Sequence, residues 1–203
     1  MRHASLVASG ALLASMLAGL ATHHHLESSD GGWRWKLPAH FAPPRVPADN
    51  PMSEDKFQLG RRLFYDKRLS GNGTQACASC HFQHLAFTDG KPVSTGSTGE
   101  ETARNAPSIA NVAYNPTFTW ANYSLVTLER HMLVPMFGEN PTELGIDDSR
   151  RDTVLQRFRA DPDYRTRFGK VFGTDAEPVS FEHIIQAIAT FQRGVVSANA
   201  RYD

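Results

Sequence analysis

The two cysteines of the chain lie three positions apart, in the segment Cys77-Ala-Ser-Cys80-His81, and the other 201 residues contain none. This pattern constrains the fold more than any other feature, and three kinds of site fit it. The cysteines can form a disulfide or a thioredoxin-like redox pair. They can bind zinc together with a residue such as His84. They can also attach a haem covalently, which would place a large apolar group in the core.

The surrounding sequence favours the haem. A thioredoxin-like pair needs a strand–helix context that is absent here, and a zinc site lacks a second Cys-x-x-Cys. Two thiols three positions apart on a short helix can reach both porphyrin vinyl groups, and the adjacent imidazole can then bind the iron. The motif therefore predicts haem c held by Cys77 and Cys80, with His81 as proximal ligand. We expect His84, on the same side of the helix, to face solvent or a propionate.

The N-terminus resembles a secretory signal. Arg2 and His3 precede the uncharged stretch LVASGALLASMLAGLA, which ends in the small residues of a cleavage site. A retained membrane anchor is the alternative, but Ala, Gly and Ser are more typical of a signal peptide than of a span. Residues 1–21 are thus predicted to be cleaved, leaving no stable membrane span. Export to the periplasm also agrees with haem c, which is attached outside the cytoplasm.

Composition excludes some partners and favours a helical fold. Lys and Arg together number 21, as do Asp and Glu, so no net charge points to nucleic acid. Strand-like alternation is scarce. Residues 22–51, rich in proline and aromatics, are expected to cross the surface in extended conformation, and residues 89–119 to form a long ordered loop. Helices are expected at 53–66, 125–135, 152–160, 162–172 and 181–195.

A small electron-carrying cytochrome c is one candidate function. Such proteins usually have a methionine as the sixth iron ligand, a few dozen residues after the haem motif. Met132 and Met136 occupy suitable positions. The chain would then be a monohaem electron-transfer protein.

A longer series of motifs points elsewhere. LGRRLFYDKRLSGNGTQACASCH, AFTDG, RNAPSIANVAYN, TLERHMLVPM and NPTELG follow one another between about Pro47 and Asp203. In this order they resemble the bacterial di-haem cytochrome c peroxidase family, which includes the MauG-type enzymes. The opening VPADNPMS resembles the MauG-like branch associated with methanobactin gene clusters. The resemblance implies an all-α, cytochrome c-like haem domain with long ordered loops.

The resemblance also assigns roles to single residues. His81 matches the proximal ligand of the peroxidatic haem, and Asn105 matches a side chain that helps hold calcium between two haems, for which a carbonyl oxygen is a suitable donor. Trp120 matches the tryptophan that relays electrons between the haems. Glu143 matches the distal glutamate, which can move a proton during cleavage of the peroxide O–O bond.

Three departures from the family pattern bear on the site. His131 stands where the family often has glutamine, so it can contact the bound peroxide, act as a base or bind the iron. Residues 96–99, where some peroxidases supply a distal histidine, contain none, which favours an open sixth position. The chain also lacks the family's second Cys-x-x-Cys-His. We therefore expect residues 52–203 to be the N-terminal, peroxidatic domain of a longer enzyme, inactive alone, whose missing half holds a second haem.

The expected activity is peroxide-dependent oxidation in the periplasm. Hydrogen peroxide would bind at the open face of the haem held by His81. Glu143 and His131 would transfer protons, and Trp120 would carry electrons. In the peroxidase version a small cytochrome or copper protein donates electrons. In the MauG-like version Trp or Tyr residues of a partner protein are oxidised.

Overall fold

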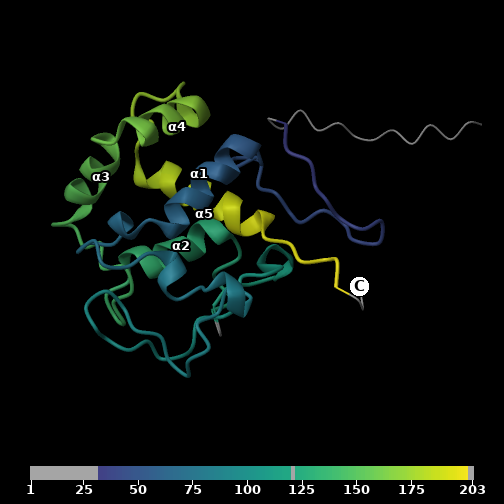
Figure 1. Cartoon of the computed structure of the whole chain (residues 1–203), viewed down its shortest axis with the longest axis horizontal. Helices are drawn as coiled ribbons and strands as arrows, with labels where there is room; N and C mark the ends of the chain where they lie inside the picture. Colours follow the sequence, from purple (N-terminus) through teal and green to yellow (C-terminus); the bar gives the residue numbers. More distant parts are fainter. Residues whose placement is uncertain (1–31, 120–121, 201–203) are drawn as a thin grey trace, which may run out of the picture.

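The computed structural model describes residues 32–119 and 122–200, and within them the protein is helical (Figure 1). The paired backbone segments in these ranges are four isolated bridges. Short 3₁₀ turns occur in the loops, including η2 at Cys77–Ser79. The expected all-α class is confirmed. The helices are α1 (Glu54–Tyr65), α2 (Leu128–Phe137), α3 (Arg151–Arg159), α4 (Pro162–Phe172) and α5 (Phe181–Gly194).

Side-chain caps explain where the helices begin. The Ser53 hydroxyl accepts a hydrogen bond from the Lys56 amide at 3.2 Å, and Ser180 accepts one from the His183 amide at the start of α5. The expectation for α2 was wrong at both ends, because the helix, capped by Thr127, begins three residues after the predicted start and continues past Pro135. The predicted start relied on apolar periodicity, whereas the cap determines the boundary.

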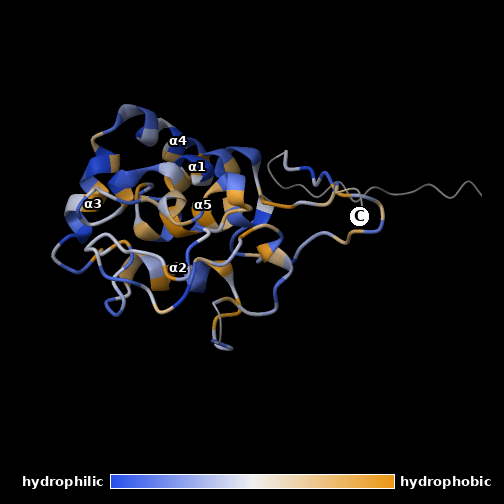
Figure 2. Cartoon of the chain, turned by 60° about the horizontal axis from the view of Figure 1, so that its bottom comes forward, coloured by the Kyte–Doolittle hydropathy of each residue, from blue (hydrophilic) through white to orange (hydrophobic). Residues whose placement is uncertain are grey.

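Helices α1 and α5 cross in close contact near the centre of the domain (Figure 1). Gly60 allows this approach, since a Cβ at this position would lie 1.8 Å from the backbone oxygen of Ala187. Helix α5 is mostly apolar, while α1 and α4 show hydrophilic outer sides (Figure 2). The fully buried residues Leu63, Phe64 and Ile188 belong to the core around this crossing.

The segment 32–51, which we call the strap, contains no helix and contacts the domain through aromatic rings. The ring of Trp33 lies 5.1 Å from that of Phe57 on α1, measured between centroids. Phe41 contacts Tyr114 at 5.9 Å, and the Tyr114 hydroxyl donates to the backbone oxygen of Ala42. Aromatic residues thus hold the strap against the domain at two places.

A buried ion pair joins α5 to α2. Nη2 of Arg193 lies 2.7 Å from Oε1 of Glu129, and the Arg193 side chain is 3% exposed. Asn50 in the strap donates to the same Glu129 oxygen and accepts from Nζ of Lys56. The strap, α1, α2 and α5 therefore meet in one polar cluster. Among the helices within 32–119 and 122–200, none has the length and apolar character needed to cross a membrane.

Candidate haem site

A cavity of about 790 Å³ lies between η2, α2, α5 and the loops that follow η2 and α2. Its wall contains polar and apolar groups from segments far apart in the sequence. Six of the seven residues predicted to be catalytic, haem-binding or metal-binding line it together. These are Cys77, Cys80, His81, Asn105, His131 and Glu143.

The two cysteines are free thiols at the wall of this cavity. Burial raises the pKa of Cys77 to about 12, and burial likewise raises the pKa of Cys80. Both groups are therefore protonated at neutral pH and are weak nucleophiles, unlike the activated thiol of a redox pair. Both thiols line the same cavity, so a group bound there can be linked covalently to each of them.

His81 is oriented by a hydrogen bond to the backbone. Its Nδ1 lies 2.7 Å from the carbonyl oxygen of Phe87, so Nδ1 carries the proton. Nε2 then keeps its lone pair, which is the form of imidazole that binds a metal. The position of that carbonyl depends on two left-handed residues, Ala86 with φ 54° and Phe87 with φ 62°. Non-glycine residues rarely adopt this conformation, so the surrounding structure must stabilise it.

His131 lies on α2 and faces the same cavity. Its ring centroid is 5.9 Å from that of Phe118. Burial and, as a smaller effect, electrostatic repulsion between protonated His131 and His81 lower its pKa to about 4, so the ring is neutral at pH 7. Its Nδ1 atom is buried and has no hydrogen-bond partner within the described part of the chain.

The backbone around Glu143 is fixed on both sides. The Glu143 carbonyl accepts from the amide of Ser97 at 2.7 Å, and the next amide, that of Leu144, donates to Pro135 at the end of α2. The loop of Gly96 lies so close that a Cβ there would be 1.8 Å from the Thr142 carbonyl. Burial raises the pKa of the Glu143 carboxyl. A carboxyl with a raised pKa can exchange protons nearer to neutral pH.

The other residues named by the sequence do not all lie at the cavity. Trp120 lies outside the described residues. Met132 lines the cavity, whereas Met136 is a fully buried core residue that does not. His84 is exposed, and its ring stacks on Phe82 at 5.7 Å. Residues 32–119 and 122–200 hold no group of three or more His, Cys, Asp or Glu suited to a metal ion.

The sequence analysis missed Gln192, which lines the cavity from α5 and is 4% exposed. Its Oε1 is buried without a hydrogen-bond partner among the residues that the structure describes. A signal was present, because Gln192 continues the i, i+4 spacing of Ile184 and Ile188, which are both fully buried. A polar residue in such a stripe indicates a polar neighbour in the fold.

These orphaned atoms test whether a haem suits the cavity. Buried polar groups in proteins normally have hydrogen-bond partners, yet His131 Nδ1 and Gln192 Oε1 both lack one in the described structure. Both belong to side chains that line the cavity carrying the Cys-x-x-Cys-His motif. A bound porphyrin and the water around it would supply an apolar body and polar partners. The residues present therefore fit the group that the motif predicts.

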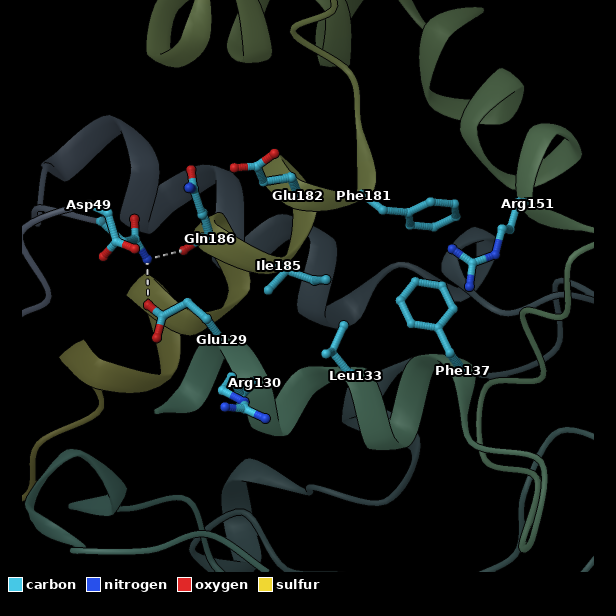
Figure 3. A pocket seen from close by; sticks show the side chains of 11 residues that line it. Asp49, Glu129, Arg130, Leu133, Phe137, Arg151, Phe181, Glu182, Ile185 and Gln186 are labelled. Carbon is cyan, nitrogen blue, oxygen red and sulfur yellow. Dashed lines mark hydrogen bonds between the residues drawn. The ribbon is translucent and has the colours of Figure 1, made fainter. Parts of the chain in front are cut away.

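A second, smaller pocket of about 420 Å³ uses a different face of α2 (Figure 3). Leu133, Phe137 and Ile185 form its apolar wall. The guanidinium of Arg151 lies 4.3 Å from the centre of the Phe137 ring and 5.9 Å from that of Phe181. None of the site residues predicted from the sequence lines this pocket. The predicted chemistry is therefore concentrated on the other face of α2.

Comparison with known proteins agrees with the geometry. The family model described as di-haem cytochrome c peroxidase matches residues 54–203. The methylamine utilization protein MauG of Methylorubrum extorquens is 34% identical over 170 residues, which are 82% of this chain and 46% of that protein. The cytochrome-c peroxidase IdrP1 of Denitromonas iodatirespirans is 40% identical over 159 residues, 78% of this chain and 40% of that protein.

A solved structure is also similar. The crystal structure of a MauG-like protein associated with microbial copper homeostasis superposes with a TM-score of 0.82 and 61% identity, covering 84% of this chain and 49% of that one. The chain thus spans about half the length of the proteins that it matches. With the family model matching nearly all of the folded domain, the chain belongs to the di-haem cytochrome c peroxidase family.

Proposed function

We propose that this chain is the peroxidatic haem domain of an exported enzyme that uses hydrogen peroxide as oxidant. The observation that carries the proposal is the convergence of Cys77, Cys80 and His81 with His131 and Glu143 on one cavity. Haem-anchoring residues and proton-transferring residues would then meet across a single bound group. The relatives are about twice as long, so we propose that the rest of the enzyme carries a second haem.

The anchoring residues would hold the haem in a defined orientation. Cys77 and Cys80 would each form a thioether with the porphyrin, and Nε2 of His81 would bind the iron on one side. The bond from His81 Nδ1 to the Phe87 carbonyl fixes the ring and makes Nε2 more basic. When bound, the haem would supply the electron chemistry of peroxide reduction.

Glu143 and His131 would handle protons at the peroxide. Peroxide cleavage requires a group that removes the proton from one oxygen and delivers it to the other, which leaves as water. Glu143, held by backbone bonds on both sides, is suited to this transfer because burial raises its pKa. The neutral ring of His131 can accept or donate one hydrogen bond to the peroxide.

Electrons would reach the site from outside this domain. We propose that Trp120 relays them from the second haem and that Asn105 contributes to a calcium site between the haems. The donor is a small cytochrome or copper protein in the peroxidase version. In the MauG-like version, Trp or Tyr residues of a partner protein are oxidised. The 61% identity to a MauG-like protein supports the second version.

The absorption spectrum of the haem-loaded, full-length protein tests the proposal. An open sixth position gives a high-spin ferric spectrum, and cyanide or peroxide should change it without prior reduction. Ligation by Met132 would instead give a low-spin ferric spectrum with the far-red band of methionine ligation. That result would show that the protein is an electron carrier instead.

A further inference from the structure

A chain of aromatic rings connects the His81 side of the cavity to the interior of the domain. The ring centroids of His81 and Phe64 lie 6.2 Å apart. Phe64 contacts Phe191 at 5.0 Å, and Phe191 contacts Phe57 at 5.4 Å. Each step is within the range of ordinary aromatic contacts, so the rings form one continuous chain of contacts.

This chain has two ends, and each carries a ring that is easily oxidised. One branch passes from Phe57 to Trp33 at 5.1 Å and on to Trp35 at 5.4 Å, both in the strap. The other reaches Tyr65, whose ring lies 5.3 Å from that of Phe64. Tyr65 is 43% exposed. The rings at the ends are therefore nearer to solvent than Phe64, which is fully buried.

The order of residue types matters chemically. Indole and phenol lose one electron far more readily than the phenylalanine ring does. The phenylalanines along the path are closely packed groups through which an electron can tunnel, while Trp and Tyr at the ends can hold the resulting oxidised state. The chain thus has bridging rings in its middle and oxidisable rings at its ends.

The two ends differ in what happens to the N–H or O–H proton when the ring is oxidised. Nε1 of Trp33 is buried and has no acceptor in the described structure, so an oxidised Trp33 would keep its proton as a radical cation. The Tyr65 hydroxyl is at the surface, 3.3 Å from Oε1 of Gln83. An oxidised Tyr65 would release its proton to solvent and become a neutral radical. The same route would therefore give two distinguishable radicals.

We propose that these rings form an escape route that carries oxidising equivalents from the haem pocket to Tyr65 and to the strap tryptophans. The proposal rests on the proposed peroxide-dependent function, which supplies the oxidant. Two successive one-electron losses from Tyr65, with capture of one water, add a hydroxyl group to the ring and release two protons. The two electrons and two protons reduce one hydrogen peroxide to two waters. Each hydroxylated ring thus accounts for one peroxide.

Peptide mass spectrometry of the haem-loaded, full-length protein tests the route. Hydrogen peroxide is added without any electron donor, and oxygen addition is measured at Tyr65, Trp33 and Trp35. We expect several-fold more addition at Tyr65 than at Tyr114, which is similarly exposed at 39% but whose ring contacts Phe41. Pretreatment with cyanide, which occupies the iron, should abolish the difference. Equal oxidation of Tyr65 and Tyr114, or oxidation that persists with cyanide, would overturn the proposal.

Conservative variants give a second readout. Tyr65→Phe combined with Trp33→Phe and Trp35→Phe keeps an aromatic ring at each position but removes the oxidisable groups from both ends, so the haem absorption should bleach several-fold faster under peroxide. Tyr114→Phe should bleach at the wild-type rate. Equal bleaching in all three proteins contradicts the route. If peroxide leaves the wild-type haem spectrum unchanged, the proposed function itself fails, and the route fails with it. A haem that reacts while Tyr65, Trp33 and Trp35 all stay unmodified overturns the route alone.

Discussion

The carbonyl oxygen of Phe87 accepts a hydrogen bond from Nδ1 of His81 at 2.7 Å. A carbonyl can only accept, so this contact selects the tautomer in which Nε2 has a free lone pair. The sequence motif places a histidine beside the second cysteine, but this bond determines which nitrogen can bind the iron. The ring is thus prepared for ligation by a backbone atom six residues away.

Removing both thiols should abolish covalent haem attachment. In Cys77→Ala with Cys80→Ala neither thioether can form, so no haem signal should remain on a denaturing gel stained for haem. The single variant Cys80→Ala is the matched control, because Cys77 can still form one bond and part of the signal should survive. A haem signal in the double variant would disprove attachment through this motif.

Glu143→Gln should slow the reaction with peroxide and leave haem attachment intact. The amide cannot accept the peroxide proton, and loss of a general acid–base group costs roughly a hundredfold or more. Since burial raises the pKa of Glu143 above 4.5, the reactive carboxylate is lost as pH falls through that raised value. Stopped-flow measurement on the full-length protein should therefore show an acidic decline in wild type that Glu143→Gln lacks. If the variant reacts at the parental rate, Glu143 is an ordinary carboxylate with no role in proton transfer.

His131→Ala tests a different contribution. Burial holds the pKa of His131 down to about 4, so the ring is neutral at pH 7. If His131 only positions the peroxide by a hydrogen bond, its loss should slow the reaction less than Glu143→Gln does. A low-spin resting spectrum that becomes high-spin in His131→Ala would show instead that this residue binds the iron.

Local signals allowed much of the fold to be predicted. Helices α1, α4 and α5 were expected close to their observed bounds, because Ser53, Pro162 and Ser180 mark their starts and their apolar positions recur at helical spacing. The haem-binding motif was equally clear, since its chemistry needs only five consecutive residues. Features that depend on a short segment alone could therefore be predicted from the sequence.

Features that depend on an unusual backbone conformation or on distant segments could not be predicted. The Phe87 carbonyl reaches His81 only because two residues adopt a left-handed backbone that their side chains do not favour. Gln192 lies in a buried stripe, but only the folded cavity shows what it faces. The contact between Trp33 and Phe57 joins the strap to α1, and apolar composition did not specify this partner.

Neutralising Glu129, which pairs with Arg193, should destabilise the protein. Glu129→Gln would leave Arg193, with a side chain 3% exposed, beside Lys56 without a counter-charge. Breaking a buried pair in this way costs about 3 kcal/mol in the free energy of unfolding. Asp55→Asn is the matched control, because Asp55 pairs with Lys170 at the surface and should cost less than about 1 kcal/mol. Urea unfolding of the haem-loaded protein measures both, and equal losses would show that burial of the pair has little effect.

Gly60→Ala should separate α1 from α5 and destabilise the protein. The new Cβ would lie 1.8 Å from the backbone oxygen of Ala187, and a backbone atom cannot turn away as a side chain can. Overpacking a rigid contact should lower the free energy of unfolding by about 3 kcal/mol, even though alanine favours helix. Gly169→Ala in α4 is the control, since a Cβ there meets no atom within 4 Å and should raise stability by about 0.5–1 kcal/mol. Urea midpoints of the two variants should therefore shift in opposite directions, and a stabilised Gly60→Ala would show that the helices do not cross this closely.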